Sequence, residues 1–112
     1  MKETSKHALL MITTPDPDTA RSIAQGALRK RLAACVQINS GVESHYWWDG
    51  KIQSAMETMV LFKTRKDSSE NLAAFIQQSH PYDTPEIIEL SITKGSESYL
   101  NWIDDQTKQE PL

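Results

Sequence analysis

Apolar and polar residues alternate along this chain in a way that predicts strands and helices in turn. Residues 7–14 are mostly apolar and end in Thr-Thr-Pro, which predicts a short buried strand closed by a turn. Asp16 and Pro17 then begin a predicted helix, because a carboxylate caps the first turn and proline is tolerated there. The apolar residues of this helix recur at helical spacing: Ala20, Ile23, Ala24, Ala27 and Leu28.

The middle of the chain predicts a long β-hairpin. Residues 33–38 form a second apolar strand, which Asn39-Ser40-Gly41 is expected to end. Residues 42–48 and 51–65 read as two strands joined by Asp49-Gly50, a strong signal for a hairpin turn. A strand covering residues 51–65 would extend about 50 Å, well beyond the usual length, so its far end is expected to project from the domain.

The last third predicts a helix, a strand and a final helix. The segment Asp67-Ser-Ser-Glu70 has the form of a capping box and is expected to open a helix that ends before Pro81. Residues 87–92 form the next apolar strand, which Gly95 ends, and Ser96 caps the last helix.

This order of elements favours an α+β fold. Helices interleaved with strands in this way predict a ferredoxin-like sandwich of one sheet and its helices, with a long projecting hairpin and a C-terminal helix. We expect a single domain over residues 7–106, with residues 1–6 and 107–112 frayed. The hairpin carries Tyr46, Trp47 and Trp48 near its tip, and exposed aromatic residues are costly unless another surface covers them. The sequence therefore predicts an oligomer in which these three residues lie at the interface.

Composition narrows the possible functions. The chain has 112 residues and a net charge of −3, which argues against a protein built to hold nucleic acid or an anionic membrane. Its apolar run at residues 8–12 is too short to span a bilayer or to act as a signal sequence. Cys35 is the single cysteine, so there is no internal disulfide and no paired-cysteine metal site. We expect a cytoplasmic protein.

Five separated stretches resemble one family, the CutA or divalent-cation-tolerance proteins. They cover residues 30–35 (KRLAAC), 46–51 (YWWDGK), 61–64 (LFKT), 80–86 (HPYDTPE) and 99–102 (YLNW), in the right order. The resemblance implies a ferredoxin-like subunit assembled as a tight homotrimer, with sheets running on between subunits. It also implies a link to tolerance of copper and other divalent cations, with no organic cofactor.

The resemblance also suggests where a metal would bind. In relatives proposed to bind copper, the ligands are a cysteine near the end of the first strand and two successive histidines before Pro-Tyr. Ile12 and Ser79 occupy two of these positions here, so only His80 matches, and Cys35 is the one soft ligand that the trimer could add. One imidazole is a poor site for Cu²⁺, so we expect weak or indirect metal binding. Without a metal, His80 would cap the preceding helix.

A second hypothesis rests on the family's similarity to the PII signalling proteins, which bind effectors in clefts between subunits. Lys63 follows an apolar stretch, and it either points to solvent or faces an anion or carboxylate in such a cleft, with Glu86 as the partner to test. Tyr82 either packs at a subunit contact or stacks on a ligand. His7 and His45 have no evident companions, and no acid–base pair, phosphate loop or triad is visible, so we expect no enzymatic activity.

Overall fold

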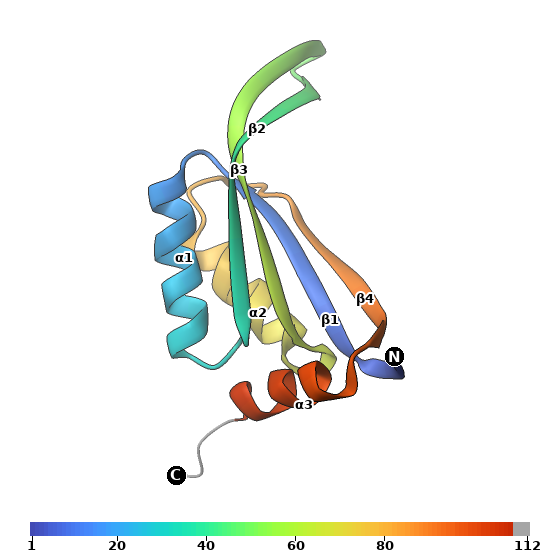
Figure 1. The fold of residues 1–112 in the computed structure, drawn as a ribbon. Coiled ribbons are helices and arrows are strands. Elements are labelled where there is room, and N and C mark those ends of the chain that lie inside the picture. The colour runs from blue at the N-terminus through green and yellow to red at the C-terminus, as the bar shows by residue number, and fades with distance from the viewer. Residues whose placement is uncertain (109–112) are drawn as a thin grey trace.

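The computed structural model describes residues 1–108, and residues 109–112 lie outside the described part (Figure 1). Four strands and three helices follow one another in the order β1, α1, β2, β3, α2, β4, α3. Their bounds are β1 Lys2–Thr14, α1 Pro17–Arg29, β2 Cys35–Trp48, β3 Lys51–Arg65, α2 Lys66–Ser79, β4 Ile87–Gly95 and α3 Glu97–Gln106. The predicted α+β class is confirmed, and so is the predicted order of elements, except that the two strands predicted at residues 33–38 and 42–48 are one strand, β2.

The four strands form one antiparallel sheet in the order β2-β3-β1-β4. Strand β1 pairs with β3 only as far as Thr14 opposite Thr58. Residues 51–57 of β3 therefore pair with β2 alone, and together with residues 42–48 they form a projecting hairpin arm (Figure 1). Asp49 and Gly50 both have positive φ, as a type I′ turn requires, so the predicted hairpin is confirmed.

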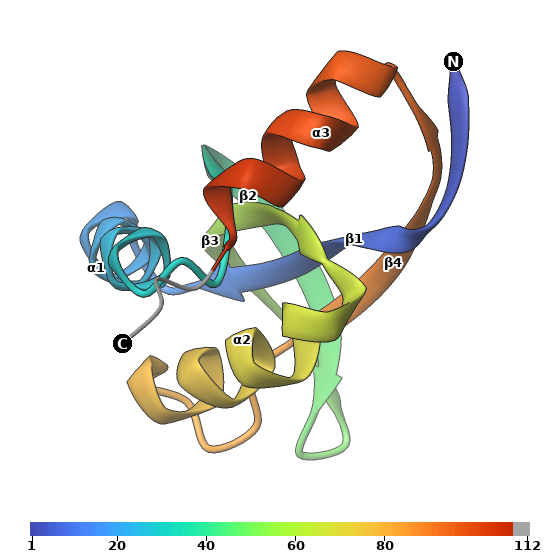
Figure 2. The same cartoon turned by 90° about the horizontal axis from the view of Figure 1, so that it is seen from below.

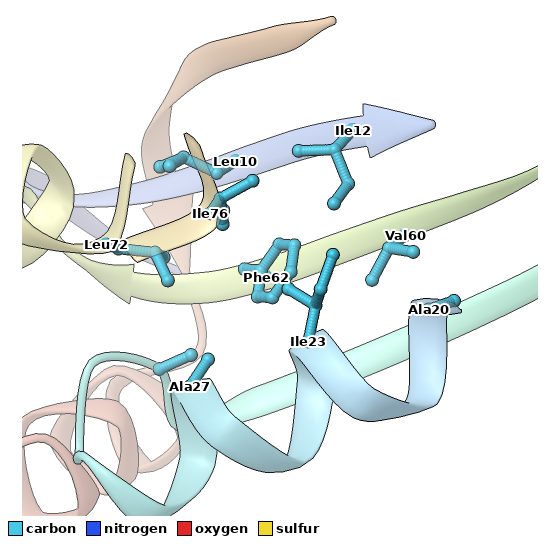
Figure 3. Packing of buried hydrophobic residues seen from close by; sticks show 10 residues of the cluster. Leu10, Ile12, Ala20, Ile23, Ala27, Val60, Phe62, Leu72 and Ile76 are labelled. Carbon is cyan, nitrogen blue, oxygen red and sulfur yellow. The ribbon is translucent and has the colours of Figure 1, made fainter. Parts of the chain in front are cut away.

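The core lies between the sheet and the two helices α1 and α2 (Figure 3). Alternate residues of the central strands turn toward these helices, and Phe62 lies at the centre with none of its surface exposed. The buried cluster combines residues of the sheet and of both helices: Leu10, Ile12, Val60, Phe62, Ala20, Ile23, Ala27, Leu72 and Ile76. The spacing of these residues explains why both helices pack on the same face.

Two helices begin as the sequence predicts, and one does not. Asp16 accepts a hydrogen bond from the Thr19 backbone N–H at 2.7 Å, and this bond lowers the pKa of the Asp16 carboxyl. Ser96 caps α3 through the Tyr99 N–H. The capping box predicted at Asp67 is wrong, because α2 already begins at Lys66 with Arg65 as its N-cap. Since Arg65 still pairs with His7 in the sheet, the chain passes from strand to helix without a linker.

Three predicted boundaries also need correction. Strand β2 does not end at Asn39-Ser40-Gly41; a bulge between Asn39 and Val42 absorbs these residues, with Gly41 at positive φ. Residues 2–6 were expected to fray, yet they extend β1, with Lys2 opposite Gly95 at the end of β4. Thr107 was expected to fray too, but it is fully buried, whereas the part of that prediction covering residues 109–112 lies outside the described residues.

Helix α3 packs on the other side of the sheet from α1 and α2, across the end away from the hairpin arm (Figure 2). A Cβ added at Gly95 would lie 2.9 Å from a methyl carbon of Leu100, so the absence of a side chain there lets the helix approach. The sheet face turned away from α1 and α2, here called the open face, is covered by α3 at this end only. The rest of the open face is not covered by any helix of the described chain.

Candidate functional site

His80 lies at the C-cap of α2, and its backbone N–H donates to the Ile76 carbonyl at 2.9 Å. Its ring is buried, with Nε2 2.7 Å from the Thr13 carbonyl oxygen. The Tyr82 backbone N–H lies 3.1 Å from Nδ1. Because a carbonyl only accepts and an amide N–H only donates, this network assigns the proton to Nε2 and the lone pair to Nδ1.

Both ring nitrogens of His80 are thus engaged within the subunit. They tie the loop after α2 to the end of β1, as the capping interpretation of this residue requires. A metal ion could bind the imidazole only by displacing one of these two partners. Within residues 1–108, no group of three or more His, Cys, Asp or Glu side chains is placed to hold a metal ion.

Tyr82 and Glu86 follow His80 in the same loop, near the base of the hairpin arm. The Tyr82 ring lies 4.8 Å from the His80 ring, tilted by 51°, and it remains partly exposed. Partial burial, and then the nearby Glu57 carboxylate, raise the pKa of the Tyr82 hydroxyl. Glu86 is exposed just before β4, whose first residue Ile87 pairs with Ile12.

Lys63 lies on the open face near the other end of the sheet. It is paired in register with Leu9 on β1 and Cys35 on β2, and its ammonium lies 5.7 Å from the centre of the Tyr99 ring. This cation–π contact with α3 is the neighbour that the sequence did not predict. Within one subunit Lys63 does not meet Glu86, because their positions differ by at least three residues along β1, or about 10 Å.

Cys35 is half-buried at the start of β2, beside Lys63. The subunit therefore separates the predicted site residues into two groups. His80, Tyr82 and Glu86 lie near the base of the hairpin arm, and Lys63 and Cys35 lie near α3. Only contact between different subunits could bring the two groups together.

A broad apolar surface is exposed on the single chain. Tyr46, Trp47 and Trp48 at the tip of the hairpin arm are 42%, 72% and 66% exposed. On the open face and α3, Leu90 and Trp102 are 46% and 40% exposed. Exposed apolar patches of this kind mark surfaces that bind another protein.

Comparison with known proteins identifies the architecture. The family described as "CutA1 divalent ion tolerance protein" matches residues 8–106, nearly the whole described chain. The chain belongs to the CutA1 family. The predicted resemblance is thereby confirmed.

Individual CutA relatives agree with this assignment. The "Divalent-cation tolerance protein CutA" of Yersinia pestis is 37% identical over 100 residues, which cover 89% of this chain and 84% of that protein. The chloroplastic protein CutA of Arabidopsis thaliana is 39% identical over 111 residues, or 96% of this chain, but the chain spans only 61% of that plant protein. A solved structure of a periplasmic divalent cation tolerance protein CutA from Archaeoglobus fulgidus has a TM-score of 0.89 and 36% identity, covering 91% of this chain and 99% of that one.

The names of these CutA relatives bear on the predicted location. One is called chloroplastic and another periplasmic, so the family occurs in more than one compartment, and the cytoplasmic location stays a prediction. Among residues 1–108, no helix is long and apolar enough to cross a membrane.

One polar cluster of this CutA1 chain was missed by sequence reasoning. His7 is buried on the open face, and its Nε2 lies 2.8 Å from Asp104 Oδ1 of α3. Its Nδ1 lies 2.6 Å from the Thr4 hydroxyl oxygen. The expectation that His7 has no companion is wrong. The partner was missed because Asp104 is 97 residues away from His7 in sequence.

His45 also has a partner, Glu43 at 2.6 Å, on the same side of the hairpin arm. An i, i+2 spacing on a strand could have indicated that second pair.

Proposed function

We propose that this chain acts as a homotrimer in tolerance of divalent cations, copper among them, and that its own metal binding is weak or indirect. Membership of the CutA1 family supports the cellular role. The observation that carries the assembly is the exposed apolar surface, which includes Trp47 and Trp48 on the hairpin arm. Copies of the chain would bury this surface on one another, and no enzymatic step is part of the proposal.

Weak metal binding is supported by the state of His80. Its two hydrogen bonds compete with any metal, and Ile12 and Ser79 supply no further ligands. A site for Cu²⁺ would need several nitrogen, sulfur or oxygen donors. Cys35 could supply one such donor, from a neighbouring subunit.

An effector-binding trimer is the second candidate, and the placement of Lys63 favours it. The Lys63 ammonium lies on the open face next to an exposed aromatic residue, Tyr99. An anionic or small-molecule ligand at a subunit boundary would find there a cation and an aromatic surface. Tyr82 and Glu86 would belong to this cleft only if a second subunit brought them near Lys63.

Copper titration tests the proposed weak metal binding at His80. We expect weak Cu²⁺ binding by calorimetry that falls between about pH 7.5 and about pH 5.5, because a ligating imidazole must be neutral. His80→Ala should abolish this binding, and His80→Gln should do so while keeping a polar group for the Thr13 carbonyl. His45→Gln is the matched control, since it removes an exposed histidine elsewhere. Binding that survives in both His80 variants would exclude His80 as a ligand, and no binding at either pH would favour the effector alternative.

Replacement of Trp48 by alanine tests the assembly at the hairpin arm. Because Trp48 is 66% exposed in the single subunit, its truncation should change subunit folding little. If a neighbouring copy covers it, the change should weaken the trimer by about 3 kcal/mol, within the range for a buried tryptophan. Sedimentation over a dilution series measures this effect, with Lys51→Ala, the cross-strand neighbour, as control. A trimer that dissociates at the same concentration as the unchanged protein would remove Trp48 from the interface.

A further inference from the structure

A hollow of about 860 Å³ lies at the end of the molecule opposite the hairpin arm. It is lined by residues of β1, of the junction between β3 and α2, and of α3 with Lys108 after it. The start of β1, the start of α2 and helix α3 all lie at this end of the molecule (Figures 1 and 2). Its volume falls within the range of sites that hold small molecules. None of Lys63, His80, Tyr82 and Glu86 lines it, so it is separate from both candidate sites described above.

The lining of this hollow gathers positive charge. Four cations reach it from three separate segments of the chain: Lys6, Arg65 with Lys66, and Lys108. Three aspartates also line it, which leaves one positive charge in excess, whereas the whole chain carries a net charge of −3. The hollow therefore differs in sign from the molecule around it.

The three aspartates already have partners within the chain. Asp104 accepts from His7 at 2.8 Å, and Asp105 Oδ1 lies 3.2 Å from the Lys108 ammonium. Asp67 Oδ1 lies 3.4 Å from Arg65 Nε. In contrast, Lys6 and Lys66 form no ion pair with any carboxylate of residues 1–108. The charge still unmatched in the lining of the hollow is thus positive.

Arg65 adds an unsatisfied donor. Its Nε atom is buried and has no hydrogen-bond partner among the described residues. The contact with Asp67 is longer than the 2.7–2.9 Å or so of a charge-assisted hydrogen bond. Buried donors are almost always paired, so the Arg65 guanidinium is poorly matched by the carboxylates of the chain.

The first turn of α2 also has backbone N–H groups without a side-chain acceptor. Arg65 is the N-cap, and no side chain caps the helix, so the first N–H groups of α2 lack a side-chain acceptor. Arg65, Lys66 and Asp67, where the helix begins, all line the hollow. A helix start beside unmatched cations is the arrangement that suits an anion with several oxygens.

We propose that this hollow binds the phosphate group of a small phosphate monoester. Lys6, Lys66 and the Arg65 guanidinium would hold the phosphate oxygens, and the rest of the hollow would take the ester group. A phosphate suits this lining better than a single carboxylate, because its charge near −2 matches two unpaired lysines. The site needs neither a bound metal nor the Lys63 cleft, so it stands or falls separately from the proposed function.

The proposal is tested by NMR titration of the full chain with methyl phosphate and with inorganic phosphate, at constant ionic strength. We expect saturable shifts confined to the amides at the start of α2 and near Lys6. Lys66→Gln should weaken binding about five- to tenfold, as expected for one charged contact near the surface. Asp105→Asn should strengthen binding, because it removes a lining carboxylate and releases Lys108. Lys51→Gln, which removes the same charge at the far hairpin turn, should leave the affinity unchanged.

The two phosphate probes and the three variants give distinct outcomes. Tighter binding of methyl phosphate supports an ester ligand, and equal binding of both probes that depends on Lys66 would overturn the ester in favour of free phosphate. Shifts that never saturate, or that scatter over the whole surface, would overturn the site. So would a Lys51→Gln effect as large as that of Lys66→Gln, or weaker binding in Asp105→Asn.

Discussion

Leu90→Glu is expected to convert the proposed trimer into monomers at micromolar concentration. Leu90 lies on the open face of the edge strand β4, opposite Leu9, and is 46% exposed in the single subunit. A carboxylate fits there when the face meets water, so the subunit itself should fold. Once another copy covers the face, the unpaired charge would be buried at a cost of about 3–5 kcal/mol per subunit.

Native mass spectrometry measures this outcome directly. The unchanged protein should appear at about three times the 12.7 kDa of one chain, and Leu90→Glu at one chain mass. Ser91→Glu is the matched control, because it places the same charge on the next residue of β4, which points to the opposite side of the sheet. A monomeric unchanged protein would contradict the trimer itself. A Leu90→Glu protein that stays trimeric would place the interface elsewhere.

The elements that sequence predicted well are those fixed by local rules. Strand β3 matches its predicted bounds, 51–65, because the Asp49-Gly50 turn fixes its start. Asp16 and Ser96 cap their helices as predicted, since each acts on an amide three residues away. Among the boundaries that were wrong, the start of β1 depends on a distant strand. Residues 2–6 are ordered by pairing with the end of β4, about 90 residues later, which no local pattern reveals.

In the candidate site, too, local features could be predicted from the sequence and contacts between distant segments could not. His80 was predicted either to cap α2 or to contact a metal, and its place before Pro81 indicated the cap. Its side-chain bond to the Thr13 carbonyl could not be predicted, because that bond joins two segments 67 residues apart. Glu86 was the partner to test for Lys63 in a cleft between subunits, and this pairing stays a prediction. Within the subunit, strand register and α3 place Lys63 against Tyr99. The hollow between β1, α2 and α3 was invisible to sequence, because its four cations come from segments that only the fold brings together.

Phe62→Ala is expected to cause the largest loss of stability of any single truncation in this subunit. Phe62 has no exposed surface, and it lies between Leu10 and Val36 on the sheet, facing α1 and α2 (Figure 3). The cavity left by the ring should lower the free energy of unfolding by about 3–5 kcal/mol per subunit. That loss is a large part of the roughly 5–15 kcal/mol that holds a typical domain together.

Urea unfolding at one fixed protein concentration measures this loss, because association makes the midpoint depend on concentration. Phe62→Leu keeps most of the apolar volume and should cost less than about 1.5 kcal/mol. Gln53→Ala, on an exposed position of the same strand, should stay within about 0.5 kcal/mol of the unchanged protein. A Phe62→Ala loss no larger than that of Phe62→Leu would mean that the core closes around the missing ring.

Since Phe62 and the half-buried Leu61 face opposite sides of β3, Phe62→Ala should act on folding while leaving the open face intact. The subunits that do fold should therefore still assemble, which separates the core of the subunit from the surface proposed to join it to its copies.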